Sequence, residues 1–83
     1  MKNYACSIDL GGTTTNFSIF ISDEIICEWT VPTPKENIID MLEYEIKDKI
    51  SKLNIKSADF KAIVIGIAGI VKEGIVRQAI NLN

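Results

Sequence analysis

Histidine is absent from this 83-residue sequence, and only two cysteines are present. Without histidine the chain has no Ser-His or Cys-His nucleophile pair, and two thiols alone make a zinc site unfavourable. Cys6 and Cys27 fall on the first and third expected strands, which lie roughly 10 Å apart if a middle strand separates them, beyond disulfide reach. Any chemistry must therefore use carboxylates, amines, hydroxyls or the backbone.

A basic stripe and a long apolar run are also missing. The formal net charge is -2 with both signs interspersed, which disfavours binding to nucleic acid or to an anionic membrane surface. No apolar run approaches the roughly 20 residues that cross a bilayer, and residues 1–3 lead into a strand without a signal-type segment. The hydrophobic fraction of 47% is that of a globular domain. We therefore expect a folded cytoplasmic protein with one small core.

Alternating apolar and polar residues predict three short strands in the first part of the chain. They cover about residues 4–10, 16–21 and 24–31. Tight turns separate them, so we expect an antiparallel meander.

A helix is expected over about residues 34–53. Thr33 can cap it, Pro34 suits its first position, and Glu36 completes a capping box. Asn54 is a suitable left-handed terminator. The apolar stripe consists of Ile38, Leu42, Ile46, Ile50 and Leu53, and the expected i,i+4 ion pairs are Glu43/Lys47, Glu45/Lys49 and Asp48/Lys52.

Residues 62–68 are apolar without alternation, as in a strand covered on both faces. A right-handed crossover through the helix sets this strand parallel to the first, giving the order 3-2-1-4. A turn at 72–74 and a strand at 75–80 would then form a C-terminal hairpin. Because a single helix covers only one face, we expect more chain or a partner on the other face and beside the fourth strand. Self-association through that edge is the corresponding expectation.

The segment from Asp9 to Thr15 (Asp-Leu-Gly-Gly-Thr-Thr-Thr) carries the best candidate for chemistry. Two glycines allow a sharp turn whose N–H groups phosphate oxygens can approach, and threonine hydroxyls add donors. Asp9 can hold a water of a magnesium ion. On spacing alone, the simpler interpretation is a two-residue hairpin turn without a ligand.

Four segments, in order and spacing, resemble the start of the ROK family (repressors, open reading frames and kinases), whose enzymes include bacterial glucokinases. They are Ile8–Thr13, Trp29–Pro34, Gly66–Val71 and Asn81–Asn83. The resemblance implies that residues 1–83 are the N-terminal part of a ribonuclease H-like (actin-like ATPase) α/β domain.

The resemblance also implies roles for individual residues. Gly69 and Asn81 would lie near the sugar, although a turn glycine and a solvated tail residue are the simpler interpretations. The residues facing the ATP phosphates would be Asp9, Gly11, Gly12, Thr13 and Thr14, with Asp9 reaching Mg²⁺ through a water. No catalytic residue is assigned, because the family's general base and its structural zinc segment would both lie downstream.

The leading hypothesis is therefore the N-terminal segment of an ATP-dependent sugar kinase, which transfers a phosphoryl group to a hexose hydroxyl and is inactive as this chain alone. A sugar-responsive regulator of the same family is a second hypothesis, but only three residues precede Tyr4, too few for a helix-turn-helix. A non-catalytic dimerising module is the third.

Overall fold

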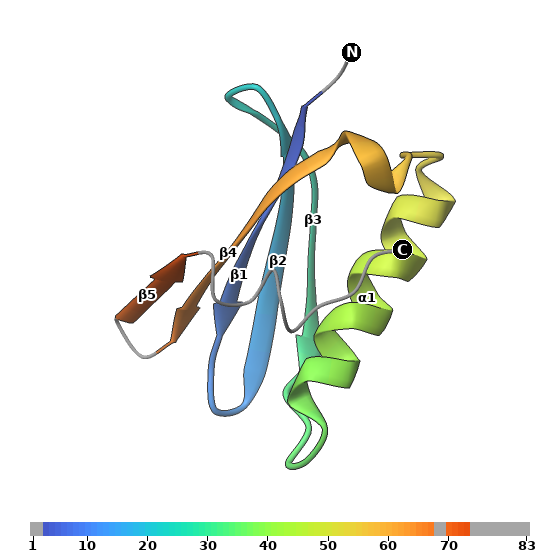
Figure 1. The fold of residues 1–83 in the computed structure, drawn as a ribbon. Helices are drawn as coiled ribbons and strands as arrows, with labels where there is room; N and C mark the ends of the chain where they lie inside the picture. The colour runs from blue at the N-terminus through green and yellow to red at the C-terminus, as the bar shows by residue number, and fades with distance from the viewer. Residues whose placement is uncertain (1–2, 68–69, 74–83) are drawn as a thin grey trace.

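The structure is a computed structural model that describes residues 3–67 and 70–73. Within them, five strands form one sheet in the order β3-β2-β1-β4-β5 (Figure 1). The elements are β1 (Tyr4–Leu10), β2 (Thr14–Ile21), β3 (Glu24–Pro32), α1 (Ile38–Lys52), a 3-10 turn (Ser57–Asp59), β4 (Phe60–Ile67) and β5 (Ile70–Glu73).

The pairing of the first four strands confirms the predicted mixed sheet. β2 is antiparallel to both β1 and β3, whereas β4 follows the crossover through α1 and runs parallel to β1. The parallel register ends at Leu10 opposite Ile67. The carboxyl ends of β1 and β4 therefore lie side by side at one end of the sheet.

The strand β5 corrects the expected C-terminal hairpin. It pairs antiparallel with β4 from Ile67↔Ile70 to Val64↔Glu73, so Lys72 and Glu73 lie in a strand rather than in the expected turn. Pairing satisfies the backbone groups that β4 would otherwise expose at its edge. The edge expected to mediate self-association is thus occupied by this chain, and the strand expected at 75–80 lies outside the described residues.

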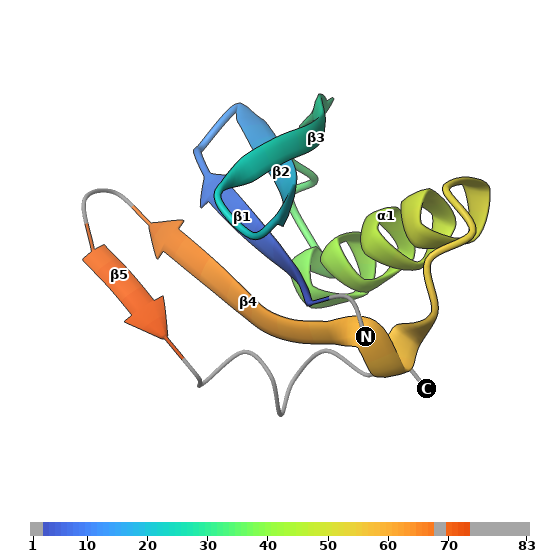
Figure 2. The ribbon, with the colours of Figure 1, turned by 90° about the horizontal axis from the view of Figure 1, so that it is seen from above.

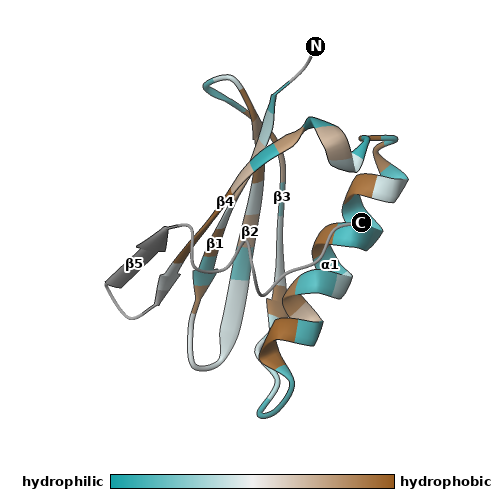
Figure 3. Cartoon of the chain, in the orientation of Figure 1, coloured by the Kyte–Doolittle hydropathy of each residue, from teal (hydrophilic) through white to brown (hydrophobic). Residues whose placement is uncertain are grey.

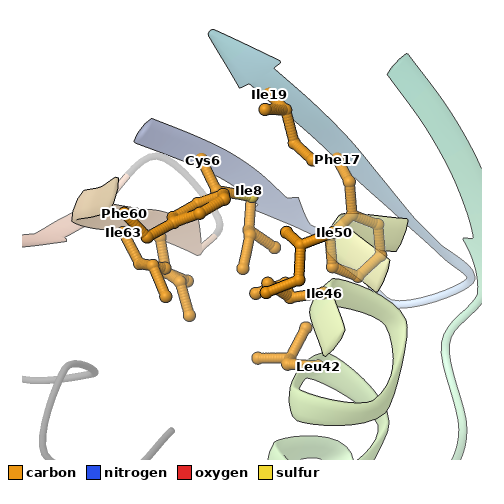
Figure 4. Packing of buried hydrophobic residues seen from close by; sticks show 10 residues of the cluster. Cys6, Ile8, Phe17, Ile19, Leu42, Ile46, Ile50, Phe60 and Ile63 are labelled. Atoms are coloured by element: carbon orange, nitrogen blue, oxygen red, sulfur yellow. The ribbon is translucent and has the colours of Figure 1, made fainter. Parts of the chain in front are cut away.

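The helix α1 packs against one face of the sheet (Figure 2). Its buried side chains meet those of the strands in one core (Figure 4), formed by Cys6, Ile8, Phe17, Ile19, Leu42, Ile46, Ile50, Phe60, Ile63 and Ile65. Burial raises the pKa of the Cys6 thiol to about 12, and both Cys6 and Cys27 are free thiols. No described helix is long and apolar enough to cross a bilayer.

The start of α1 differs from the prediction, whereas its end agrees. The helix begins at Ile38 after Asn37, which has φ 59° and makes no side-chain cap. Thr33 does not cap it, because its hydroxyl donates to the carbonyl of Gly11 instead. At the other end Asn54 has φ 58°, and the N–H of the next residue, Ile55, donates to the Ile50 carbonyl at 2.8 Å. This closes the helix in a Schellman motif.

Polar and apolar positions alternate along α1 in Figure 3, and its exposed residues include Ile39 and Tyr44 as well as charged side chains. Two of the expected ion pairs form, Glu43/Lys47 at 3.1 Å and Asp48/Lys52 at 3.0 Å. The third pair contacts Trp29 instead: Glu45 accepts a hydrogen bond from its indole N–H at 3.0 Å, and the Lys49 ammonium lies 4.7 Å from its ring. The edge strand β3 is thereby tied to α1.

Candidate functional site

The loop between β1 and β2 lies at the carboxyl end of β1, beside the end of β3 (Figure 1). The structure brings the five predicted phosphate-side residues together there, and all five are exposed: Asp9, Gly11, Gly12, Thr13 and Thr14. The predicted sugar-side residues Gly69 and Asn81 lie outside the described residues. Ligands of open α/β sheets commonly bind beyond the carboxyl ends of parallel strands, so the loop is in a suitable place.

The loop backbone departs from an ordinary two-residue hairpin turn. The N–H of Gly11 donates to the Thr14 carbonyl at 3.0 Å, which leaves Gly12 and Thr13 at the centre of the turn. Type I′ and II′ hairpin turns need a positive φ at the first central residue. Neither Gly12 nor Thr13 has a left-handed φ. A left-handed backbone is therefore not the reason that glycine stands at these positions of the turn.

The two glycines have different roles. A Cβ added at Gly11 would lie 2.7 Å from the Thr14 carbonyl oxygen, whereas a Cβ added at Gly12 would meet nothing within 4 Å. Gly11 is therefore required by the fold of the chain itself. Among the described residues the space beside Gly12 is open, so a side chain there would fill that space without meeting a described neighbour.

Backbone donors are available at the same place. No described carbonyl accepts a hydrogen bond from the N–H of Gly12 or Thr13. Exposed, unpaired N–H groups in a tight turn form anion-binding concavities. The loop thus offers two donors and open space to an anionic oxygen.

Asp9 occupies the sheet face opposite α1. Its neighbours across the sheet are Gly66 on β4 and Asn16 on β2. Because Gly66 has no side chain, space is open beside the carboxylate on the β4 side. The described residues contain no group of three or more His, Cys, Asp or Glu that could hold a metal.

The contact between two hydroxyl groups at the loop was not predicted from the sequence. Thr33 donates its hydroxyl to the Gly11 carbonyl at 2.8 Å and lies 2.7 Å from the Thr15 hydroxyl. Thr15 is fully buried. Its position in the alternation of β2, on the face of Phe17 and Ile19, was the available signal, because a hydroxyl on an apolar face needs a partner.

A separate groove lies between the end of β3 and the first turns of α1. It has a volume of about 670 Å³, and its lining contains none of the phosphate-side residues. The lining residues are Val31, Pro32, Pro34, Glu36, Asn37, Asp40, Met41, Tyr44 and Glu45. The groove and the phosphate-side loop are therefore distinct sites.

A family model for ROK proteins matches residues 5–83. The chain belongs to the ROK family. This membership confirms the family that the four sequence segments indicated.

Two solved structures resemble this ROK chain. The ROK hexokinase from Thermus thermophilus matches with a TM-score of 0.63 and 24% identity, over 77% of this chain and 22% of that one. The gluconate kinase from Lactobacillus acidophilus matches with a TM-score of 0.63 and 18% identity, over 81% of this chain and 16% of that one. The similarity establishes the fold, and the chain spans about a fifth of the length of these proteins. No curated protein matches the sequence.

Proposed function

We propose that this chain is the N-terminal segment of an ATP-dependent sugar kinase, which transfers a phosphoryl group from ATP to a hexose hydroxyl. The observation that carries the proposal is the loop at Gly12, at the carboxyl end of β1, where the described residues leave open space and provide no acceptor for the N–H groups of Gly12 and Thr13. Membership of a family that includes a hexokinase supports the same assignment. A cytoplasmic location would suit such an enzyme.

In this proposal the loop holds the phosphates of ATP. The N–H groups of Gly12 and Thr13 donate to phosphate oxygens, and the exposed hydroxyls of Thr13 and Thr14 add further donors. Gly11 gives the turn its close approach to Thr14. Asp9 contacts a water of the Mg²⁺ ion that accompanies the nucleotide, because Mg²⁺ retains most of its waters.

The chain alone is proposed to be inactive. Phosphoryl transfer depends on positioning and on neutralising charge from both sides of the reacting group. In this proposal Asp9, the carboxylate beside the loop, serves the metal-bound water and not proton transfer from the sugar. Gly69 and Asn81 are proposed to lie on the sugar side, with the general base and any structural zinc in sequence beyond this segment.

Phosphoryl transfer can be measured with a panel of hexoses, Mg²⁺ and ATP, using a full-length protein that begins with these residues. The 83-residue chain serves as the matched control. We expect the full-length protein to phosphorylate at least one hexose and the chain alone to give only the uncatalysed rate. Absence of transfer to every hexose by a folded full-length protein that binds ATP would contradict the sugar-kinase assignment.

A further inference from the structure

Thr33, between β3 and α1, makes three hydrogen bonds to the β1–β2 hairpin. Its N–H donates to the Thr13 carbonyl at 2.9 Å. Its hydroxyl donates to the Gly11 carbonyl at 2.8 Å, across a separation of 22 residues, and lies 2.7 Å from the Thr15 hydroxyl. Both carbonyls that Thr33 holds belong to the phosphate-side loop.

The direction of these bonds follows from the chemistry of the groups. A hydroxyl has one hydrogen to donate and two lone pairs that accept. Because the Gly11 carbonyl can only accept, the Thr33 hydrogen goes to it. Thr15 must then donate to Thr33. The buried Thr15 hydroxyl therefore depends on Thr33 for its partner, whereas the bond from Thr33 to Gly11 does not depend on Thr15.

Each peptide unit is planar and trans, so its C=O and the N–H of the next residue point in opposite directions. A bond that fixes the Gly11 carbonyl therefore also fixes the Gly12 N–H, which points away from the Thr33 hydroxyl. The bond to the Thr13 carbonyl fixes the Thr14 N–H in the same way. Thr33 thus sets the orientation of the Gly12 N–H, from which no described carbonyl accepts a hydrogen bond.

We propose that Thr33 is a positioning residue, whose hydroxyl orients the Gly12 N–H so that the loop accepts the phosphates of a nucleoside triphosphate. Thr15 supports Thr33 from the core without itself orienting the loop. This inference rests on the proposed function, because it names the residue that organises the proposed phosphate site. It adds a role for a side chain that acts through the backbone of the loop.

Variants of the 83-residue chain can separate positioning from stability. Thr33→Val leaves the Thr15 hydroxyl buried without a partner, which lowers the free energy of unfolding. Thr15→Val/Thr33→Val removes both hydroxyls at nearly constant shape, so stability returns toward that of the wild type. Thr33→Ser keeps the hydroxyl. Thr30→Val is the matched control, because the Thr30 hydroxyl donates to the Asn16 side chain at 2.6 Å and not to the loop.

The affinity for Mg-ATP is measured from the amide shift of Gly12 in an NMR titration. We expect the affinity to fall about 10-fold in Thr33→Val, which corresponds to the free energy of one hydrogen bond. The double variant should lose affinity by the same factor, although its stability recovers. Thr33→Ser and Thr30→Val should bind as the wild type does. Recovery of affinity in the double variant, or unchanged affinity in Thr33→Val, would overturn the inference.

Two measurements distinguish an error in the role of Thr33 from an error in the proposed phosphate site. If the wild-type chain does not respond to Mg-ATP, the proposed phosphate site is overturned together with the ligand that the inference names. The orienting role is still decided in the free chain by the exchange rate and shift of the Gly12 amide. These should change in Thr33→Val and in the double variant only, and an unchanged Gly12 amide would overturn that role.

Discussion

The two hairpin turns of the meander lie at opposite ends of the sheet (Figure 1), and they are built differently. The β2–β3 turn at Ser22 and Asp23 is compact, with Ser22 at φ 55°, the backbone sign that two-residue hairpins require. The β1–β2 turn has glycines at 11 and 12 but no left-handed residue. It is held instead by Thr33, from outside the hairpin.

The difference separates a turn shaped by its own left-handed residue from a turn that has open space and an external support. The β2–β3 turn contains a left-handed residue, as two-residue hairpins require. The β1–β2 turn has a glycine whose Cβ position meets no described residue, and Thr33 supports it from outside the hairpin. The proposed function assigns these features at the carboxyl end of β1 one purpose, the approach of an anion.

The largest effect is expected at Gly12. In the full-length protein, Gly12→Val fills the open space beside the loop, so Mg-ATP affinity should fall at least about 100-fold while sugar affinity stays largely intact. Isothermal titration calorimetry with each ligand measures both. If the variant bound ATP as tightly as the wild type does, the β1–β2 loop would be a simple hairpin turn without a ligand, like the β2–β3 turn.

A smaller effect, on stability, is expected at Gly11. The Cβ of Gly11→Ala would lie 2.7 Å from the Thr14 carbonyl oxygen, so we expect the free energy of unfolding to fall by about 1–3 kcal/mol. Gly12→Ala is the matched control and should change it by less than about 1 kcal/mol. Urea denaturation measures both variants. Equal losses of stability would contradict the division of roles between the two glycines.

The smallest effect is expected at the other turn. Ser22→Gly relieves a left-handed backbone but makes the unfolded chain more flexible, so the free energy of unfolding should change by less than about 1 kcal/mol. Mg-ATP affinity should not change, since this turn lies at the far end of the sheet. Denaturation and titration of this variant check both statements, and a weakened affinity would remove the distinction between the turns.

Local patterns were enough to predict most of the fold. Alternation in the strands and the apolar run at 62–68 led to the correct order of the first four strands, and Asn54 marked the end of α1. The predicted start of α1 was wrong. Thr33 is a good cap by sequence, but its hydroxyl donates to the carbonyl of Gly11, 22 residues away. The short strand β5 was missed because the free edge of β4, rather than any alternation, favours it.

The candidate site was predictable in part for the same reason. The glycines and threonines of the loop are consecutive, so a motif identifies them as a group. The different roles of Gly11 and Gly12 depend on where the Thr14 carbonyl lies, and the contribution of Thr33 depends on a contact between distant segments. Neither can be obtained from spacing alone.

The most direct test of the account is a titration of the ¹⁵N-labelled chain with Mg-ATP, followed at both turns by NMR. We predict that the amides of Gly11 to Thr14 shift in a saturable manner, while those of Ser22 and Asp23 do not move. Absence of saturable shifts at the loop, or equal shifts at the two turns, would contradict the claim that the β1–β2 loop is a phosphate-binding site.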